Sequence, residues 1–260
     1  MWVFCCGMYR SGSTLQFQIT SELVTQMGQG IQIGWIDARR FAEVKQEQED
    51  KTGLESQCLK VVKVHDCTPA IRAEFEQQNA IGIYSFRDLR DVFVSMMQQQ
   101  QKSFDQLWKE NFIESCLHNH QLWTSLPTVL VSAYEKMIAD VPGEVQRIAT
   151  HLGLCMTETE GQTIAANYNL DEQRQRIAHF RAKLLQTPLN PEDHRTIFDY
   201  HDEKTLLHLN HIHAVQAGRW QHELSTQQAD LIAERVSNWY RTQPSATTNW
   251  ELLGRELIDQ

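Results

Sequence analysis

A glycine-rich segment near the start of the chain, Gly7–Thr14 (GMYRSGST), has residue types and spacing that suit it to holding a phosphate group. The frame of two glycines with four residues between them is typical of loops that wrap phosphates with backbone N–H groups. Ser13 stands where nucleoside-triphosphate enzymes carry a lysine, and the nearest cation is Arg10, inside the loop. The segment therefore predicts a site for a smaller phosphate, with Arg10 as a planar, bidentate partner. The plainer alternative is a helix start capped by Ser11 or Ser13.

Polar side chains also follow two later apolar runs. Arg87 ends one run, and Ser95 lies eight residues further on, two turns into a predicted helix, so the two side chains can converge on one dianion. Lys63 and His65 close another run and lie on the same side of it, because side chains alternate along a strand. Histidine titrates near neutrality, which makes His65 a candidate general base, with the Asp66 carboxylate as its rival.

Apolar runs and amphipathic segments alternate over the first 150 residues, and these elements must position the polar residues. We expect strands over 2–6, 31–38, 59–64, 81–86 and 128–134, and helices over 13–27, 39–51, 69–78, 88–101 and 143–152. Such alternation predicts right-handed βαβ units and a parallel sheet, with the ligand crevice at the carboxyl ends of the strands. Beyond residue 154 we expect helices over 158–186, 203–213 and 225–241.

The overall composition is that of a globular protein without strong charge. The 260 residues are 41% hydrophobic and 22% charged, and the formal net charge of −9 argues against a general nucleic-acid binder. Six cysteines without a Cys-x-x-Cys pair indicate buried free thiols in a reducing compartment. No apolar stretch approaches the ~20 residues of a membrane span, and the apolar start lacks a basic flank. We therefore expect a cytoplasmic protein without a transmembrane segment.

The phosphate-binding segments together resemble one family. YRSGST is similar to the 5′-phosphosulfate loop of the sulfotransferases that use PAPS (3′-phosphoadenosine 5′-phosphosulfate), in which Lys or Arg precedes Ser-Gly-Thr/Ser-Thr. YSFRDLRDVFVS resembles the 3′-phosphate motif of that family, with Arg87 and Ser95 at the matching positions and Leu89 in place of the usual proline. The resemblance covers about residues 2–240, but its specific motifs lie mainly before Tyr134.

Three weaker matches complete the resemblance. Lys63 and His65 match the Lys-Thr-His stretch of cytosolic members, with another residue in place of the threonine. Tyr134 matches a tyrosine that contacts the adenine end of PAPS. Gly218 and Trp220 match a Gly-x-Trp that closes over the 3′-phosphate, although the preceding Arg-Lys-Gly of cytosolic members is absent.

The resemblance implies a fold and a reaction. The fold is α/β, a three-layer P-loop-type fold with a central parallel sheet and a helix-rich C-terminal part, here one domain over 1–260. Residues 1–154 would form the nucleotide-binding part, and 155–260 would complete the acceptor and 3′-phosphate sites. The reaction is transfer of a sulfuryl group from PAPS to a hydroxyl or amine of a small-molecule, lipid or carbohydrate acceptor, with release of 3′,5′-ADP and no metal.

The resemblance also assigns roles to residues. His65 would be the base, and Arg10 and Lys63 would offset charge that develops on the transferred group. The residues expected to bind the cofactor are Arg10, Ser11, Gly12, Ser13, Thr14, Leu15, Arg87, Ser95, Tyr134, Gly218, Arg219 and Trp220.

Other interpretations stay open from the residues alone. A P-loop kinase would need a displaced lysine and an acid for Mg²⁺, for which Asp37 and Asp66 are the candidates. A nucleotide-binding protein of the same fold without catalysis is a second alternative, because the C-terminal half of the clamp is weak. His208, His211 and His213 suggest a metal site, but no carboxylate or cysteine completes it, so we expect none.

Overall fold

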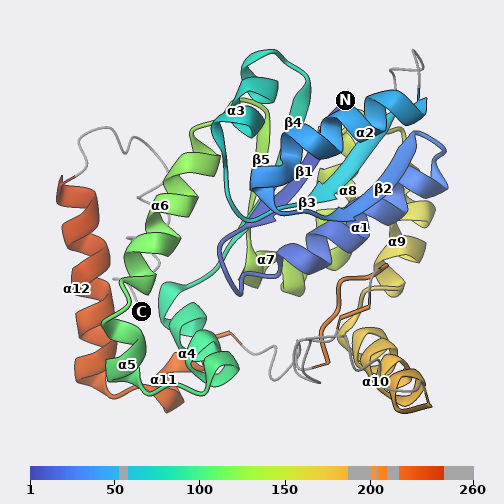
Figure 1. Cartoon of the computed structure of the whole chain (residues 1–260). Coiled ribbons are helices and arrows are strands. Elements are labelled where there is room, and N and C mark those ends of the chain that lie inside the picture. Colours follow the sequence, from blue (N-terminus) through green and yellow to red (C-terminus); the bar gives the residue numbers. More distant parts are fainter. Residues whose placement is uncertain (53–57, 187–200, 203, 210–216, 243–260) are drawn as a thin grey trace.

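A five-stranded parallel sheet forms the centre of the molecule (Figure 1). The computed structural model describes residues 1–52, 58–186, 201–202, 204–209 and 217–242. The strands are β1 (Trp2–Gly7), β2 (Gly30–Trp35), β3 (Leu59–Lys63), β4 (Ala80–Phe86) and β5 (Val129–Ala133). Their order across the sheet is β2-β3-β1-β4-β5, and all four neighbouring pairs are parallel. The predicted α/β class with a central parallel sheet is confirmed.

Every residue of β1 is buried, as expected for a central strand covered on both faces. Two apolar cores lie on the two faces of the sheet. One contains Phe17 and Leu23 of α1 (Ser13–Gln26) with Ile148 of α8 (Val141–His151). The other contains aromatic side chains from the helices on the opposite face, such as Phe75 and Trp123. The sheet and its two helical layers give the three-layer arrangement that the family resemblance implied.

All five helices predicted over the first 152 residues are present, the second of them as a short 3-10 turn followed by an α-helix. They are α1, η1 (Ala38–Arg40, a 3-10 turn), α2 (Phe41–Thr52), α3 (Pro69–Glu76), α4 (Leu89–Gln100) and α8. The strand expected over 31–38 ends at Trp35, because the Asp37 side chain accepts from the N–H of Arg39 and caps η1. Three helices were not predicted: α5 (Phe104–Trp108), α6 (Phe112–Thr124) and α7 (Tyr134–Ala139). Tyr134 therefore begins a helix directly after β5 instead of ending the strand.

The described part of the second half is mainly helical, except for a turn between His201 and His208. Its helices are α9 (Glu158–Ala166), α10 (Leu170–Gln186), α11 (Trp220–Glu223) and α12 (Thr226–Thr242). The helix expected over 158–186 is two helices, because the Asn169 side chain accepts from the N–H of Glu172 at the start of α10. Residues from this half join both cores, for example Ile164 on one face and Ile232 on the other. The division at residue 154 stays a prediction.

The prediction of a helix over 203–213 is wrong for residues 204–209, which the structure describes and which are not helical. His201 and His208 form an isolated antiparallel bridge, and the chain turns between them. Leu206 has a positive φ of 58°, and the Asp202 carboxylate accepts from the N–H of Thr205. Leu206 and Leu207 are buried at the tip of this turn, so their apolar spacing reflects packing and not a helix. Residues 210–213 lie outside the described residues.

No helix in the described part of the chain is both long and apolar enough to cross a membrane.

Candidate active site

The phosphate loop connects β1 to α1 at the carboxyl edge of the sheet. Gly12 is the N-cap of α1, with φ 83°, and no side chain caps the helix. The capped helix start through Ser11 or Ser13 is therefore wrong. The first N–H groups of a helix have no partners within it, and they carry the positive end of the helix dipole. This loop consequently presents donors that suit an anion.

Gly12 is required by both conformation and space. A Cβ atom there would approach the Tyr134 ring to 2.7 Å and Met137 Cε to 2.8 Å. Arg10 also has a positive φ, 63°, which costs a residue with a side chain roughly 1 kcal/mol. This conformation in a loop that faces a cavity makes the Arg10 side chain a candidate for a functional role.

Two cavities flank the loop, and Arg10, Gly12 and Thr14 border both of them. The first, here called the Arg87 cavity, has a volume of about 260 Å³. Its lining includes eight residues that were predicted to bind the cofactor: Arg10, Gly12, Thr14, Leu15, Arg87, Ser95, Tyr134 and Arg219. The second, here called the His65 cavity, has a volume of about 330 Å³ and includes the three predicted catalytic residues, Arg10, Lys63 and His65.

The Arg87 cavity concentrates positive charge. Arg10 Nε donates to Ser95 Oγ at 2.9 Å, which links the phosphate loop to α4. The Arg87 guanidinium lies over the Tyr134 ring, 4.5 Å from its centroid, and Arg219 lines the same cavity. Burial, and then the neighbouring Arg87, lower the pKa of Arg10. A bound anion would relieve the repulsion between these guanidiniums, which makes the cavity a phosphate-binding candidate.

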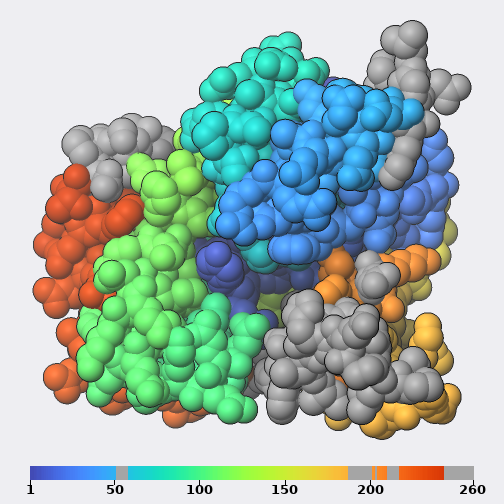
Figure 2. All heavy atoms as spheres, in the orientation of Figure 1, coloured from blue at the N-terminus to red at the C-terminus, as the bar shows by residue number. Residues whose placement is uncertain are grey.

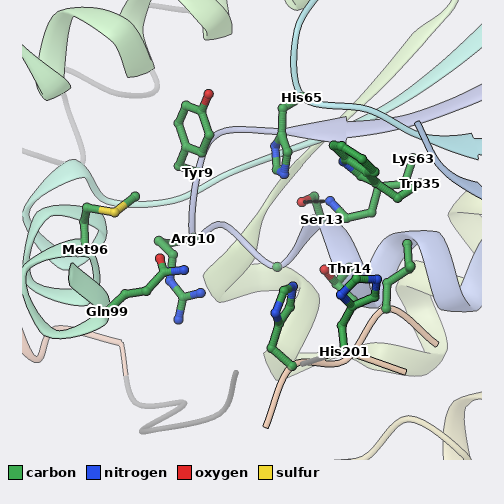
Figure 3. A pocket seen from close by; sticks show the side chains of 13 residues that line it. Tyr9, Arg10, Ser13, Thr14, Trp35, Lys63, His65, Met96, Gln99 and His201 are labelled. Atoms are coloured by element: carbon green, nitrogen blue, oxygen red, sulfur yellow. Dashed lines mark hydrogen bonds between the residues drawn. The ribbon is translucent and has the colours of Figure 1, made fainter. Parts of the chain in front are cut away.

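The His65 cavity brings together the predicted catalytic groups (Figure 3). Lys63 Nζ donates to Ser13 Oγ at 2.9 Å, and burial lowers the pKa of Lys63 to about 8. Burial, and then the Lys63 ammonium, lower the pKa of His65 to about 3. The imidazole is therefore neutral at pH 7 and has a lone pair that can accept a proton. The Tyr9 ring stacks on it, with centroids 5.1 Å apart.

Helix α6 fixes the segment directly after β3, which carries His65. The His65 carbonyl accepts from Asn119 Nδ2 at 2.8 Å and from Trp123 Nε1 at 2.9 Å. Tyr84 of β4 donates in turn to Asn119 Oδ1 at 3.0 Å. Sequence analysis missed this support. The sequence signal was the spacing of Asn119 and Trp123, which lie four residues apart and therefore on the same side of α6.

Three residues predicted to bind the cofactor lie outside the cavity linings in the described part of the chain. The Ser11 hydroxyl is fully buried and bonds to the carbonyls of Met8 and Ser85. Gly218 and Trp220 donate their N–H groups at 2.8 and 3.0 Å to the buried carboxylate of Asp91. Of the three neighbouring positions Gly218, Arg219 and Trp220, only Arg219 lines the Arg87 cavity.

Asp91 connects the two halves of this site, and sequence analysis missed it. Its side chain is completely buried, and it accepts from Arg87 Nη2 at 3.2 Å as well as from the N–H groups of Gly218 and Trp220. The carboxylate therefore holds Arg87 and the segment before α11 in a fixed relation. Its signal in the sequence was its position one turn of helix after Arg87.

The acids that the kinase interpretation requires do not line either cavity. Asp37 pairs with Arg39 at 2.6 Å outside the phosphate loop, and Asp66 is exposed. Within the described ranges, no group of three or more His, Cys, Asp or Glu side chains is placed to hold a metal ion. Two of the three histidines considered for a metal, His211 and His213, lie outside those ranges.

Solved structures with the same fold include a retinol dehydratase and a sulfotransferase. Retinol dehydratase with androsterone and the inactive cofactor PAP matches with a TM-score of 0.63 and 15% identity, over 95% of this chain and 83% of that one. The retinol complex of the same enzyme with PAP matches with a TM-score of 0.61, 15% identity and the same coverage. Mouse sulfotransferase SULT7A1 with PAP matches with a TM-score of 0.63 and 15% identity, over 99% of this chain and 87% of that one. These similarities show the fold.

A search of curated proteins finds no match to this chain. The model of the sulfotransferase domain family, in contrast, matches residues 2–244, nearly the whole length. This match confirms the resemblance that the phosphate loop and the Arg87–Ser95 motif predicted. The chain belongs to the sulfotransferase family.

Proposed function

We propose that the protein transfers a sulfuryl group from PAPS to a hydroxyl or amine of a small-molecule, lipid or carbohydrate acceptor and releases 3′,5′-ADP. The observation that carries this proposal is the pair of cavities that meet at Arg10. One cavity has the cations for a nucleotide with two separated phosphates, and the other has a neutral imidazole beside a lysine. The bound PAP in the related structures supports the same assignment of the donor.

The donor fits the Arg87 cavity by chemistry. Arg87 and Ser95 would bind the 3′-phosphate, since a guanidinium and a hydroxyl supply charge-assisted and neutral hydrogen bonds. The N–H groups at the start of α1, with Arg10 and Thr14, would bind the 5′-phosphate. Tyr134 offers a ring face for the nucleotide. The loop backbone at Gly12 lies against the Tyr134 ring, and a side chain at that position would clash with the ring.

The reaction follows from the position of His65. The acceptor oxygen or nitrogen forms a bond to sulfur, while the bond from sulfur to the 5′-phosphate oxygen breaks and its electron pair leaves with the phosphate. His65 accepts the acceptor proton. Arg10 and Lys63, which border the same space, stabilise the negative charge that develops on the bridging and sulfuryl oxygens. All three side chains are held before substrate binds, so little reorganisation is needed.

We also propose a reducing, cytoplasmic compartment for the protein. All six cysteines are free thiols, and Cys5, Cys6 and Cys116 are buried. Burial raises the pKa of Cys5 to about 12, so this thiol stays protonated and unreactive.

The donor assignment is tested by thermal unfolding with two nucleotides. We expect 3′,5′-ADP to stabilise the protein, by about 2.7 kcal/mol at a hundredfold excess over Kd, and ATP with Mg²⁺ to stabilise it less. The reason is that Arg87 and Ser95 suit a 3′-phosphate, while neither cavity lining in the described chain supplies a carboxylate for Mg²⁺. An equal or larger shift with ATP and Mg²⁺ would favour a kinase.

The charge on Lys63 should set the alkaline limit of activity. Burial lowers the pKa of Lys63 to about 8, below its value in an unfolded chain, so the ammonium loses its proton as pH rises through 8. We expect kcat/KM for PAPS, which reports the free enzyme, to fall above pH 8 by up to tenfold per pH unit. Lys63→Met should lower kcat/KM about a hundredfold at pH 7 and remove this fall. Persistence of the same alkaline fall in Lys63→Met would exclude Lys63 as its source.

A further inference from the structure

The His65 cavity has a mixed wall. Lys63 and Arg10 border it, and His201 and Gln99 contribute an imidazole and an amide (Figure 3). A second imidazole comes from His208, and apolar surface comes from Tyr9, Trp35, Met96 and Leu206. No carboxylate belongs to its lining in the described part of the chain. A cationic amine would find no counter-charge in such a wall. The combination of apolar surface with imidazole and amide groups suits an acceptor that has both an apolar face and several hydroxyl groups.

Two aromatic side chains, Tyr9 and Trp35, belong to this wall, and Trp35 is the exposed one. Trp35 lines the same cavity and is 55% exposed, the most exposed aromatic among the large hydrophobic side chains of the described residues. It closes β2, the edge strand, and its register partner on β3 is Lys63. The indole therefore lies next to the predicted catalytic end of β3, with its ring open to solvent and available to a ligand.

A bulge in β2 gives Trp35 this place. The pairing of β2 with β3 shifts by one residue between Gln32 and Gly34, and Gly34 has φ 105°, a conformation that side chains rarely adopt. Bulges at sheet edges redirect the side chains that follow them, and they recur beside active sites. Trp35 is thus exposed while it is still paired with β3, and the bulge before it sets the direction of its side chain.

We propose that the acceptor is a carbohydrate whose pyranose ring stacks on Trp35. A pyranose has an apolar C–H face, which packs on the electron-rich face of an indole, and hydroxyl groups around its edge. Those hydroxyls would exchange hydrogen bonds with Gln99, His201 and His208, while one of them faces His65. An exposed indole beside imidazole and amide groups matches this combination of an apolar face and edge hydroxyls.

This inference rests on the proposed function, and the chemical step is the same. The sugar hydroxyl oxygen forms a bond to sulfur, and the sulfur–oxygen bond to the 5′-phosphate breaks with its electron pair on the phosphate. The hydroxyl proton passes to His65. The products are a sugar O-sulfate and 3′,5′-ADP, and no further reactant is needed.

The test is transfer of ³⁵S from labelled PAPS to a defined panel of acceptors. The panel contains methyl pyranosides with gluco, galacto, N-acetylglucosamine and glucuronate rings, cellobiose, and the non-sugar acceptors androsterone, retinol and 4-nitrophenol. We expect at least one carbohydrate to have a higher kcat/KM than every non-sugar acceptor. Trp35→Ala should lower kcat/KM for that carbohydrate by about tenfold or more, with the loss mainly in KM. Trp35→Phe, which keeps a ring face, should restore part of it.

Ile31→Ala is the matched control, because Ile31 is an exposed β2 residue that does not line the cavity. It should leave kcat/KM unchanged. Binding of 3′,5′-ADP, measured by calorimetry on the same samples, separates the two proposals. If 3′,5′-ADP binds but no carbohydrate is sulfated, or androsterone, retinol or 4-nitrophenol is preferred, the carbohydrate proposal is overturned and the donor assignment stands. If 3′,5′-ADP does not bind, the proposed function itself fails, and this inference fails with it.

Discussion

Replacing His65 with alanine is expected to lower kcat by about 10²- to 10⁴-fold, the usual range for loss of a general base. His65 lines the His65 cavity and does not line the Arg87 cavity, where the nucleotide is proposed to bind. The affinity for 3′,5′-ADP should therefore change little. The low pKa of His65, about 3, means that the free enzyme holds this imidazole in its neutral form throughout the neutral range. The acid side of the kcat/KM profile should therefore show no fall near pH 6.5 from this group.

The experiment compares His65→Ala with Asp66→Asn, using the best acceptor from the panel and steady-state ³⁵S transfer. Asp66 is the adjacent acid, but it is exposed and does not line the cavity within the described chain, so Asp66→Asn should keep near-normal turnover. Normal turnover in His65→Ala together with an inactive Asp66→Asn would transfer the base role to Asp66. Calorimetry with 3′,5′-ADP provides the control for folding in both variants.

The second large effect is expected from Arg87→Ala. Removal of this guanidinium should weaken binding of 3′,5′-ADP by about 2 kcal/mol or more, roughly 30-fold, because a dianion loses a charge-assisted partner. Ser95→Ala should cost less, since it removes one neutral hydroxyl. Titration calorimetry measures both changes. An unchanged affinity in Arg87→Ala would remove the 3′-phosphate assignment.

Arg87 also has a structural role that this experiment must separate. Its ion pair with the buried Asp91 means that Arg87→Ala leaves a buried carboxylate without its cation, which destabilises the fold. Arg87→Lys is the matched control, because it keeps a positive charge near Asp91 but loses the planar fork. We expect Arg87→Lys to recover most of the free energy of unfolding and only part of the nucleotide affinity.

The parallel sheet and the phosphate loop could be predicted because their signals are local. β1 is a continuous apolar run followed at once by the glycine frame, and both features arise from neighbouring residues. The Arg87–Ser95 pair was predictable for the same reason, since both residues lie on one strand–helix unit. Parallel strands bring such units together at one edge, which is why motifs far apart in the sequence meet at Arg10.

Features set by long-range contacts could not be predicted. Asn119 and Trp123 support His65 across more than 50 residues, and no local pattern connects them. The turn at Leu206 has a helix-like spacing of leucines, but burial of those side chains against the first half of the chain overrides that pattern. The shift at Gly34 that exposes Trp35 depends on pairing with β3, which the sequence of β2 alone does not specify.

The most direct test of the donor assignment is a crystal structure of the protein with 3′,5′-ADP. We predict the 3′-phosphate at Arg87 and Ser95, the 5′-phosphate at the start of α1 beside Arg10, and the nucleotide in the Arg87 cavity, with the His65 cavity left open for the acceptor. A nucleotide that occupies the His65 cavity, or one whose phosphates contact neither Arg10 nor Arg87, would contradict it.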